Sequence, residues 1–291
     1  MHPDTELLPG RRPYDVAIPA PGPGPQHWAG APSAVAEDDG SIVLSYRRRD
    51  APGVDALVIA RSTDGVEFQT TAELVPARVG AAMTERAALL RVAADHWRAY
   101  LSFATPGSKH WWVGQADASS PEALVTASVD PVFAGDERMG FKDPVVVRSR
   151  GEWHAFLCGH PLDVLDAEDR MITHLSRSVD GRSWSQPVPV LRGRDGAWDA
   201  RGARITAVLP GGAYAYDGRA SAAENWFEKT ALATGDPPTP LDVEPVPRTR
   251  YLDVVGISDG SWRIYYEHAL PDESHELRTE LVKLEGGGSA G

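Results

Sequence analysis

Apolar and polar residues alternate along most of the chain in short runs that are separated by turns. Residues 41–46, 97–103 and 153–157 alternate aromatic or β-branched side chains with polar ones, which is the pattern of a half-buried β-strand. Helical periodicity is nowhere sustained for twelve residues. The pattern therefore predicts an all-β protein.

These strands recur with a period near fifty residues, which is typical of propellers and solenoids. The strands that precede them start 56 residues apart, at positions 31, 87 and 143, and further copies start near 204 and 251. A third strand then returns in each copy. Asp-Gly pairs such as Asp64-Gly65 supply the positive φ of a tight hairpin, and an aromatic residue shortly after them can begin a fourth strand. Each copy is therefore expected to be a four-stranded antiparallel meander.

Five such copies predict a single domain with the fold of a five-bladed β-propeller. We expect the blades at about residues 31–80, 87–136, 142–193, 199–247 and 251–284. The last blade lacks an outer strand, so the extended segment 14–18 is expected to close the ring. The Gly- and Ser-rich tail, residues 285–291, is expected to be flexible. Two packed β-sandwich domains are the alternative, but a sandwich does not require five equal units.

Composition and charge narrow the possible partners. The 291 residues are 42% hydrophobic and 24% charged, which indicates a globular chain and excludes collagen, coiled coil and wholesale disorder. The formal net charge of −12 argues against nucleic acid and anionic membranes as partners. No 18-residue apolar run and no signal-like segment is present, so we expect a cytoplasmic protein. The single cysteine, Cys158, fits a reducing compartment.

The candidates for chemistry are charged and aromatic residues near the starts of the first strands. In a propeller these strands line the central channel, so we expect the side chains to meet at one mouth of it. The carboxylates are Glu85, Asp143, Asp199 and Asp253, with Glu224 in a loop of blade four. The cations, at strand starts or in loops expected on the same face, are Arg47, Arg86, Lys109 with His110, Lys142, Arg201, Arg204 and Arg219. Trp112 and Trp198 are placed to stack on a sugar ring, and His160 to bind a hydroxyl or shuttle a proton.

Five blades with Asp143-Pro144 opening the third resemble the glycoside hydrolase propellers of families 43 and 32 and the related phosphorylases of family 130. The resemblance covers about residues 14–284 and implies that Asp143 orients the substrate and tunes the pKa of the acid. Two positions depart from it. Families 43 and 32 carry an aspartate base or nucleophile at the start of blade one, where this chain has Ala31. Family 43 carries its acid in a Glu-Gly-Pro stretch, and the nearest match here is Arg201-Gly202-Ala203.

The first hypothesis is a glycosidase that acts on a small saccharide or glycoside. Glycoside hydrolysis by the usual route needs two carboxyl groups. We expect Asp143 to be the orienting carboxylate, Glu224 or Asp199 the acid, and Glu85 the base. The substrate-binding residues are expected to be Lys142, Arg86, Arg201, Arg204, Arg219, His160, Trp112, Trp198 and Asp253.

Two other hypotheses remain open. If the cations converge, they could hold an anionic substrate or phosphate, as in a phosphorylase that resembles family 130 and needs only one acid. The alternative for the cations is that they pair with carboxylates at the channel mouth. The other hypothesis, suggested by the two departures from the family 43 pattern, is a propeller that binds a glycan or metabolite without turning it over. No ligand spacing matches a zinc site, so no metal or other cofactor is expected, although a single calcium ion in the channel stays open.

Overall fold

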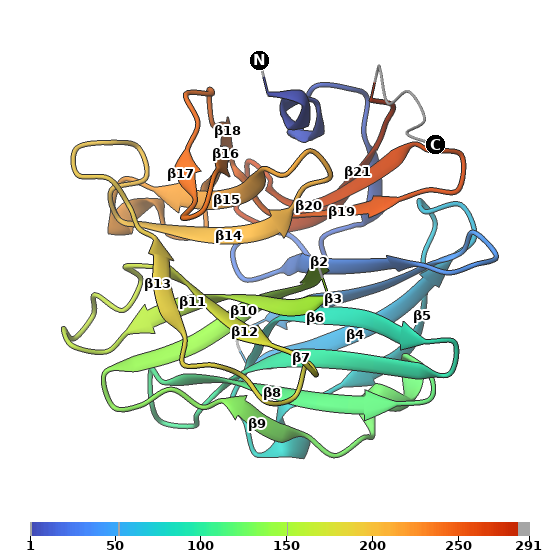
Figure 1. Cartoon of the computed structure of the whole chain (residues 1–291), viewed down its shortest axis with the longest axis horizontal. Coiled ribbons are helices and arrows are strands. Elements are labelled where there is room, and N and C mark those ends of the chain that lie inside the picture. Colours follow the sequence, from blue (N-terminus) through green and yellow to red (C-terminus); the bar gives the residue numbers. More distant parts are fainter. Residues whose placement is uncertain (1, 52, 150, 285–291) are drawn as a thin grey trace.

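The computed structural model describes residues 2–51, 53–149 and 151–284, so the expected flexible tail lies outside the described residues. The alternating runs form antiparallel strands that follow one another along the chain (Figure 1). The first unit comprises β2 (Trp28–Ala36), β3 (Ile42–Ala51), β4 (Val54–Ser62) and β5 (Gln69–Leu74). The second comprises β6 (Thr84–Ala93), β7 (His96–Ala104), β8 (Trp111–Ala118) and β9 (Asp130–Phe133).

The remaining strands repeat this order. The third unit comprises β10 (Met139–Ser149), β11 (Glu152–Pro161), β12 (Ile172–Ser178) and β13 (Val188–Leu191). The fourth comprises β14 (Gly202–Val208), β15 (Tyr214–Arg219), β16 (Lys229–Thr234) and the two-residue strands β17 (Thr239–Pro240) and β18 (Val246–Pro247). The fifth comprises β19 (Thr249–Gly256), β20 (Trp262–Ala269) and β21 (His275–Val282). Short 3-10 helices connect some strands: η2 (Pro76–Val79), η3 (Glu122–Val125) and η4 (Ala222–Glu224).

The first strands of the five units contact one another in the cyclic order β2, β6, β10, β14, β19 and back to β2. Single parallel bridges also join β21 to β2 and β12 to β14, and Figure 1 shows the red strands β19–β21 next to the blue β2. This order is what the predicted ring of blades requires. Apolar clusters fill the space between units; one of them contains Leu57, Leu89, Trp97 and Phe103 from the first two units.

Each first strand is interrupted by a register shift. The shifts lie between Gly30 and Ser33, Thr84 and Ala87, Lys142 and Val145, Ile205 and Ala207, and Arg250 and Asp253. Ala31, Asp143 and Tyr251 occupy matching places at three of these shifts and all have positive φ, of 55°, 51° and 56°. A bulge re-aims the side chain that it carries. Ala31 is therefore the counterpart of Asp143 in the first unit.

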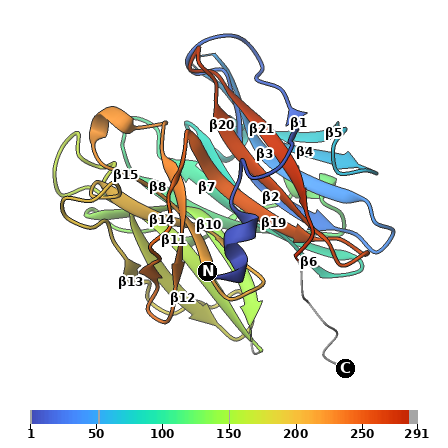
Figure 2. The ribbon, with the colours of Figure 1, turned by 90° about the horizontal axis from the view of Figure 1, so that it is seen from above.

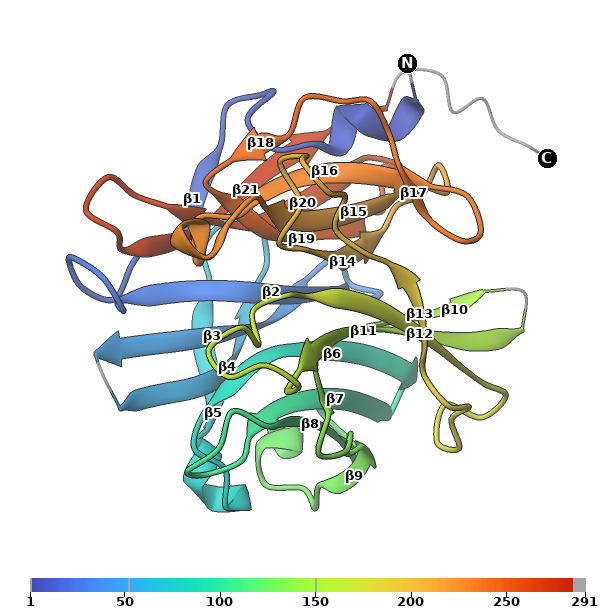
Figure 3. The same ribbon diagram turned by 90° about the vertical axis from the view of Figure 1, so that its left-hand side faces the viewer.

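The N-terminal segment packs against the end of the chain. β1 (Asp15–Ile18) pairs antiparallel with β21, in the place expected for residues 14–18 (Figures 2 and 3). The sequence did not predict η1 (Pro3–Leu7), whose Leu7 is fully buried with residues of units four and five. The Asp4 carboxylate also accepts hydrogen bonds from the backbone N–H groups of Gly211 and Ala213, at 2.8 and 2.9 Å.

None of the helices in the described part of the chain has the length and apolar character needed to cross a membrane.

Candidate functional site

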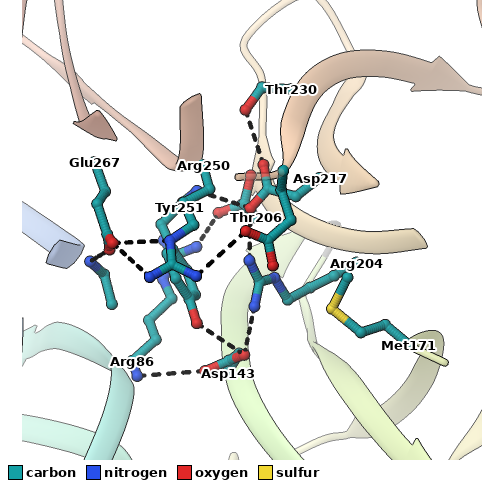
Figure 4. Close-up of polar contacts among 12 residues, drawn as sticks. Arg86, Asp143, Met171, Arg204, Thr206, Asp217, Thr230, Arg250, Tyr251 and Glu267 are labelled. Carbon is teal, nitrogen blue, oxygen red and sulfur yellow. Dashed lines mark hydrogen bonds and ion pairs between the residues drawn. The ribbon is translucent and has the colours of Figure 1, made fainter. Parts of the chain in front are cut away.

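A buried network of ion pairs occupies the channel where the register shifts lie. Arg204 is 2% exposed and places Nη1 2.9 Å from Oδ2 of Asp143 and Nη2 2.8 Å from Oδ2 of Asp217 (Figure 4). Its guanidinium carbon lies 3.8 Å from the centre of the Tyr251 ring. Burial opposes the charge, but Tyr251, Asp143 and Asp217 raise the pKa of Arg204 well above its usual value. Arg204 is therefore a charged group that joins units three, four and five.

Tyr251 connects two carboxylates from different units. Its hydroxyl oxygen lies 3.3 Å from Oε2 of Glu85 and 3.3 Å from Oδ2 of Asp143. These two carboxylate oxygens are therefore no more than about 6.6 Å apart, twice that distance. Burial raises the pKa of Tyr251 well above its usual value, so the phenol stays protonated and can donate to one carboxylate at a time.

Glu85 is the ionised carboxylate of this network that reaches the surface, because 11% of its side chain is exposed. Arg47 places Nη1 2.5 Å from Oε2 of Glu85, and Arg49 lies 3.9 Å from Oε1. Burial alone would raise the pKa of Glu85, but Arg47, Lys142 and Arg49 together lower it to about 2. Glu85 is therefore an anion at neutral pH.

Asp55, at the start of β4, lies beside Glu85. Its Oδ2 accepts the backbone N–H of Thr84 at 3.0 Å and lies 3.5 Å from Nη2 of Arg49, while its buried Oδ1 has no hydrogen-bond partner among the described residues. Burial raises the pKa of the Asp55 carboxyl against the opposing effect of Arg49. Because Arg49 contacts both carboxylates, Oδ2 of Asp55 and Oε1 of Glu85 are no more than about 7.4 Å apart. The two neighbouring carboxyl groups thus have pKa values that are shifted in opposite directions.

Another carboxylate of the network, that of Glu267 on β20, lies beneath the start of β2. Oε2 of Glu267 accepts the backbone N–H of Ala31 at 3.0 Å, and Oε1 lies 2.6 Å from Nη2 of Arg250. Arg47 also contacts Glu267, at 3.3 Å. A Cβ at Gly30 would lie 1.7 Å from Oε2 of Glu267, so this approach requires glycine at position 30. Burial opposes ionisation, but Arg250 and Arg47 lower the pKa of Glu267, which is an anion.

Two of the predicted site residues line a separate cavity. Arg86 donates from Nη2 to Oδ1 of Asp253 at 3.1 Å, and its backbone N–H lies 3.4 Å from Oδ1 of Asp143. Both side chains line a cavity of about 520 Å³ that is otherwise mostly apolar and formed by the far halves of the first strands. The Arg86–Asp253 pair therefore faces the other side of the register shifts from Glu85.

The predicted acids are not part of the network. Asp199 is fully buried, where it accepts hydrogen bonds from Arg194 and from the Tyr216 hydroxyl, at 2.9 and 3.0 Å. Trp198 stacks on Tyr216, at 5.5 Å between ring centres. Glu224 lies in η4 and accepts the backbone N–H of Ala220 at 2.8 Å. These contacts hold Asp199 and Trp198 inside unit four. The hydrogen bond from Ala220 to Glu224 stabilises the loop that carries Glu224.

The other predicted residues divide between the network and its surroundings. Lys142 lies 3.8 Å from Oδ2 of Asp143, with its ammonium 4.8 Å from the ring centre of Trp111. Arg219 pairs with Glu228 at 2.6 Å, and Arg201 pairs with Asp169 at 2.8 Å.

His160 lies 3.2 Å from the carbonyl oxygen of Lys109, and burial together with Lys142 lowers the pKa of His160 to about 3. Trp112 packs on Phe103 in the apolar core of unit two.

Sequence reasoning examined the starts of the first strands and the loops, so it missed Asp55 on the third strand β4 and Glu267 on the second strand β20. It also passed over Arg250, which precedes Tyr251 on the first strand β19. Part of the signal lay in the second strands. Arg47, Asp217 and Glu267 pair with Gly30, Arg204 and Arg250, just before or beside the register shifts. A charged residue in the same place of three second strands indicates a buried network, because such residues are rarely buried unless paired.

The described residues contain no group of three His, Cys, Asp or Glu side chains that is arranged to hold a metal ion. Cys158 is buried on β11, and burial together with Asp143 raises the pKa of its thiol to about 12. Its thiol is therefore protonated at neutral pH.

No family model matches the sequence, and no curated protein does. Solved structures do match. A glycosyl hydrolase from Bacteroides ovatus is 14% identical with a TM-score of 0.60, and the match covers 94% of this chain and 95% of that one. A sucrose-6-phosphate hydrolase from Lactobacillus gasseri is 11% identical with a TM-score of 0.65, and the match covers 96% of this chain and 62% of that one.

A third match comes from work on the family 130 mannoside phosphorylases, which contain glycoside hydrolases that target β-1,2-mannosidic linkages in Candida mannan. It is 15% identical with a TM-score of 0.57, and it covers 94% of this chain and 95% of that one. The chain has the fold of the glycoside hydrolase-like propellers. The all-β propeller class predicted from the sequence repeats is confirmed. At these identities the matches establish the fold and leave the reaction to the arrangement of this chain's own residues.

Proposed function

We propose that the chain is a glycosidase that acts on a carbohydrate at the channel mouth, with Glu85 as the ionised carboxylate and Asp55 as the proton donor. The observation that carries this proposal is the position of both carboxyl groups beside Arg49, 3.5 and 3.9 Å from its Nη2. Their pKa values are shifted in opposite directions. Such a pair is the usual sign of an acid and a base in one site.

The proposed reaction follows from these protonation states. Asp55 donates its proton to the glycosidic oxygen as the bond to the anomeric carbon breaks. Glu85 either attacks that carbon or removes a proton from the water that does so. Arg47 and the Tyr251 hydroxyl hold the Glu85 carboxylate in place, at 2.5 and 3.3 Å. Asp143 acts as a positioning residue, because it shares the Tyr251 hydroxyl with Glu85.

This assignment replaces Glu224 and Asp199 as the acid and keeps Glu85 as the base. It places the acid on the first unit, whereas family 43, which the chain resembles, places it on the fourth. A different acid is needed in this chain, because the position of the family 43 acid is occupied by Arg201, which pairs with Asp169.

The test uses two aryl glycosides that differ in their leaving group, drawn from a panel of sugars that includes mannosides and fructosides. Asp55→Asn should lower turnover of the poor leaving group by about 10² to 10⁴ and leave the activated dinitrophenyl glycoside nearly unchanged, because that leaving group needs no proton. Glu85→Gln should lower turnover of both. Asp38→Asn, a carboxylate that is 90% exposed, is the matched control. Full activity of Asp55→Asn on both substrates would refute the assignment.

A second function is a propeller that binds a carbohydrate without turnover. It is favoured by Ala31, which stands where the related families carry a carboxylate, and by the arginines that neutralise Glu85 and Glu267. Calorimetric binding of a saccharide by a wild-type protein that turns over no glycoside of the panel would favour this function. Turnover only in the presence of inorganic phosphate would instead favour a phosphorylase.

A further inference from the structure

An open groove of about 820 Å³ lies between units three and four. It is lined by residues at the start of β10, the end of β11 and the starts of β12 and β14, and Met139 pairs with Pro161 across two of these strands. Asp143 lies four positions beyond Met139 on β10. The groove therefore opens at the same end of the strands as the candidate site.

Four arginines surround this groove: Arg138, Arg170, Arg192 and Arg201. Two of them are held by carboxylates. Arg201 makes a two-point contact with Asp169, at 3.1 and 2.8 Å, and Arg170 pairs with Asp163. The side chains of the other two make no ion pair or hydrogen bond with any residue that the structure describes. The groove therefore carries more positive than negative charge in a chain whose net charge is −12.

The groove is connected to the candidate site through Asp169. This carboxylate contacts Arg201 in the groove and also Nη2 of Arg219, at 3.4 Å. Arg219 in turn pairs with Glu228 at 2.6 Å, and Glu228 lies 3.3 Å from Arg250 of the network. Met171, which lines the groove, lies 3.9 Å from Nη1 of Arg219. A ligand in the groove would thus lie next to residues that surround the channel mouth.

We propose that this groove binds a phosphate or sulfate ester carried by the carbohydrate on which the site acts. Guanidinium groups bind tetrahedral oxyanions through two parallel hydrogen bonds, and Arg201 is already oriented by Asp169. A neutral sugar would use hydroxyl partners and would not require Arg138 and Arg192, the two arginines of the groove whose side chains pair with no described carboxylate. The substrate class rests on the proposed function, whereas binding of the ester itself does not depend on turnover.

The test compares four forms of one sugar: glucose, glucose 6-phosphate, glucose 6-sulfate and glucuronate. Binding is measured by calorimetry on the wild-type protein, because none of these four sugars contains a glycosidic bond that the proposed site could hydrolyse. We expect the phosphate or sulfate ester to bind at least about tenfold more tightly than glucose, because each charged hydrogen bond contributes on that scale. The affinity should fall as salt is raised.

The variant Arg138→Gln with Arg192→Gln should remove most of this preference and leave the weak binding of glucose unchanged. Arg11→Gln, an exposed arginine of the N-terminal segment, is the matched control. Equal affinity for glucose and its esters would overturn the groove proposal, as would an unchanged preference in the double variant. Glucuronate that binds as tightly as the esters would overturn the ester as the recognised group. Absence of glycosidase activity in the wild-type protein, with retained ester binding, would count against the proposed function alone.

Discussion

A carboxylate oxygen of Glu267 lies 3.0 Å from the backbone nitrogen of Ala31. Ala31 stands where the related families carry their aspartate, and its place at the register shift matches that of Asp143. Position 31 has no carboxylate of its own, and the carboxylate beside it is that of Glu267 on β20. The Glu267 carboxylate is buried among Arg47, Arg250 and His275. The carboxylate that the family pattern has at position 31 is therefore replaced in the structure by one from another strand, in the fifth unit, and it is paired with cations.

Substitution of Gly30 by alanine should disrupt this arrangement. The added Cβ would lie 1.7 Å from Oε2 of Glu267, so the carboxylate must move away from the Ala31 N–H and from its arginine partners. We expect the free energy of unfolding to fall by about 3–5 kcal/mol, the cost of breaking a buried ion pair. Chemical denaturation measures this. Gly256→Ala is the control, because its Cβ would meet only the Trp262 ring, at 3.3 Å. An equal small effect for both variants would contradict the account.

Replacement of Arg204 by methionine should leave Asp143 and Asp217 buried without their shared cation. The expected loss is about 3–5 kcal/mol in the free energy of unfolding. Adding Asp143→Asn and Asp217→Asn should restore part of it, since no buried charge is then left unpaired. Arg12→Met, which removes a partly exposed pair with Glu6, should cost less than about 1 kcal/mol. A single variant Arg204→Met as stable as the wild type would show that the network does not stabilise the fold.

Acid should destabilise the protein below about pH 4.5. The arginines around Glu85 and Glu228 overcome burial and lower both pKa values from 4.5 to about 2. Their contribution to stability is complete above the unfolded pKa and is lost as the pH falls from about 4.5 towards 2. Asp217, whose pKa is raised by burial, acts in the opposite sense. Denaturation curves between pH 2 and 7 check the slope, and Glu228→Gln should make it shallower. A stability that is flat down to pH 3 would be inconsistent with these pairs.

Asp4 should anchor η1 to unit four. Asp4→Ala leaves the backbone N–H groups of Gly211 and Ala213 without their acceptor, which should cost about 1–3 kcal/mol. Thermal unfolding measures the loss. Asp15→Ala, at an exposed position of β1, is the control and should have little effect. If Asp4→Ala matched the control, the docking of η1 would not contribute to stability.

The repeat predicted the strands well because alternation and turn residues are local signals. The expected start of the first three blades was late by about three residues, since β2, β6 and β10 begin before their register shifts.

The site was predicted less completely. Glu85, Asp143 and Arg204 do meet, because the starts of the first strands converge. Asp55 and Glu267 come from third and second strands, and their pairing depends on blade register, which the local pattern of one strand does not reveal. The partial match of Arg201-Gly202-Ala203 to the Glu-Gly-Pro acid stretch of family 43 rests on Gly202, and a glycine at this position has a purely structural reason. Its φ is 155°, and a Cβ there would lie 2.5 Å from the backbone nitrogen of Met171.

The pairing of β1 with β21 has a consequence for synthesis on the ribosome. Asp15 is opposite Thr279, so β1 remains without its partner until the five following units, as far as β21, have been translated. Closing so long a loop is slow and entropically costly. During that interval the backbone groups of β1 are exposed and unpaired. The shortness of β1, which has four residues, and the charge of Asp15 limit its pairing with other strands.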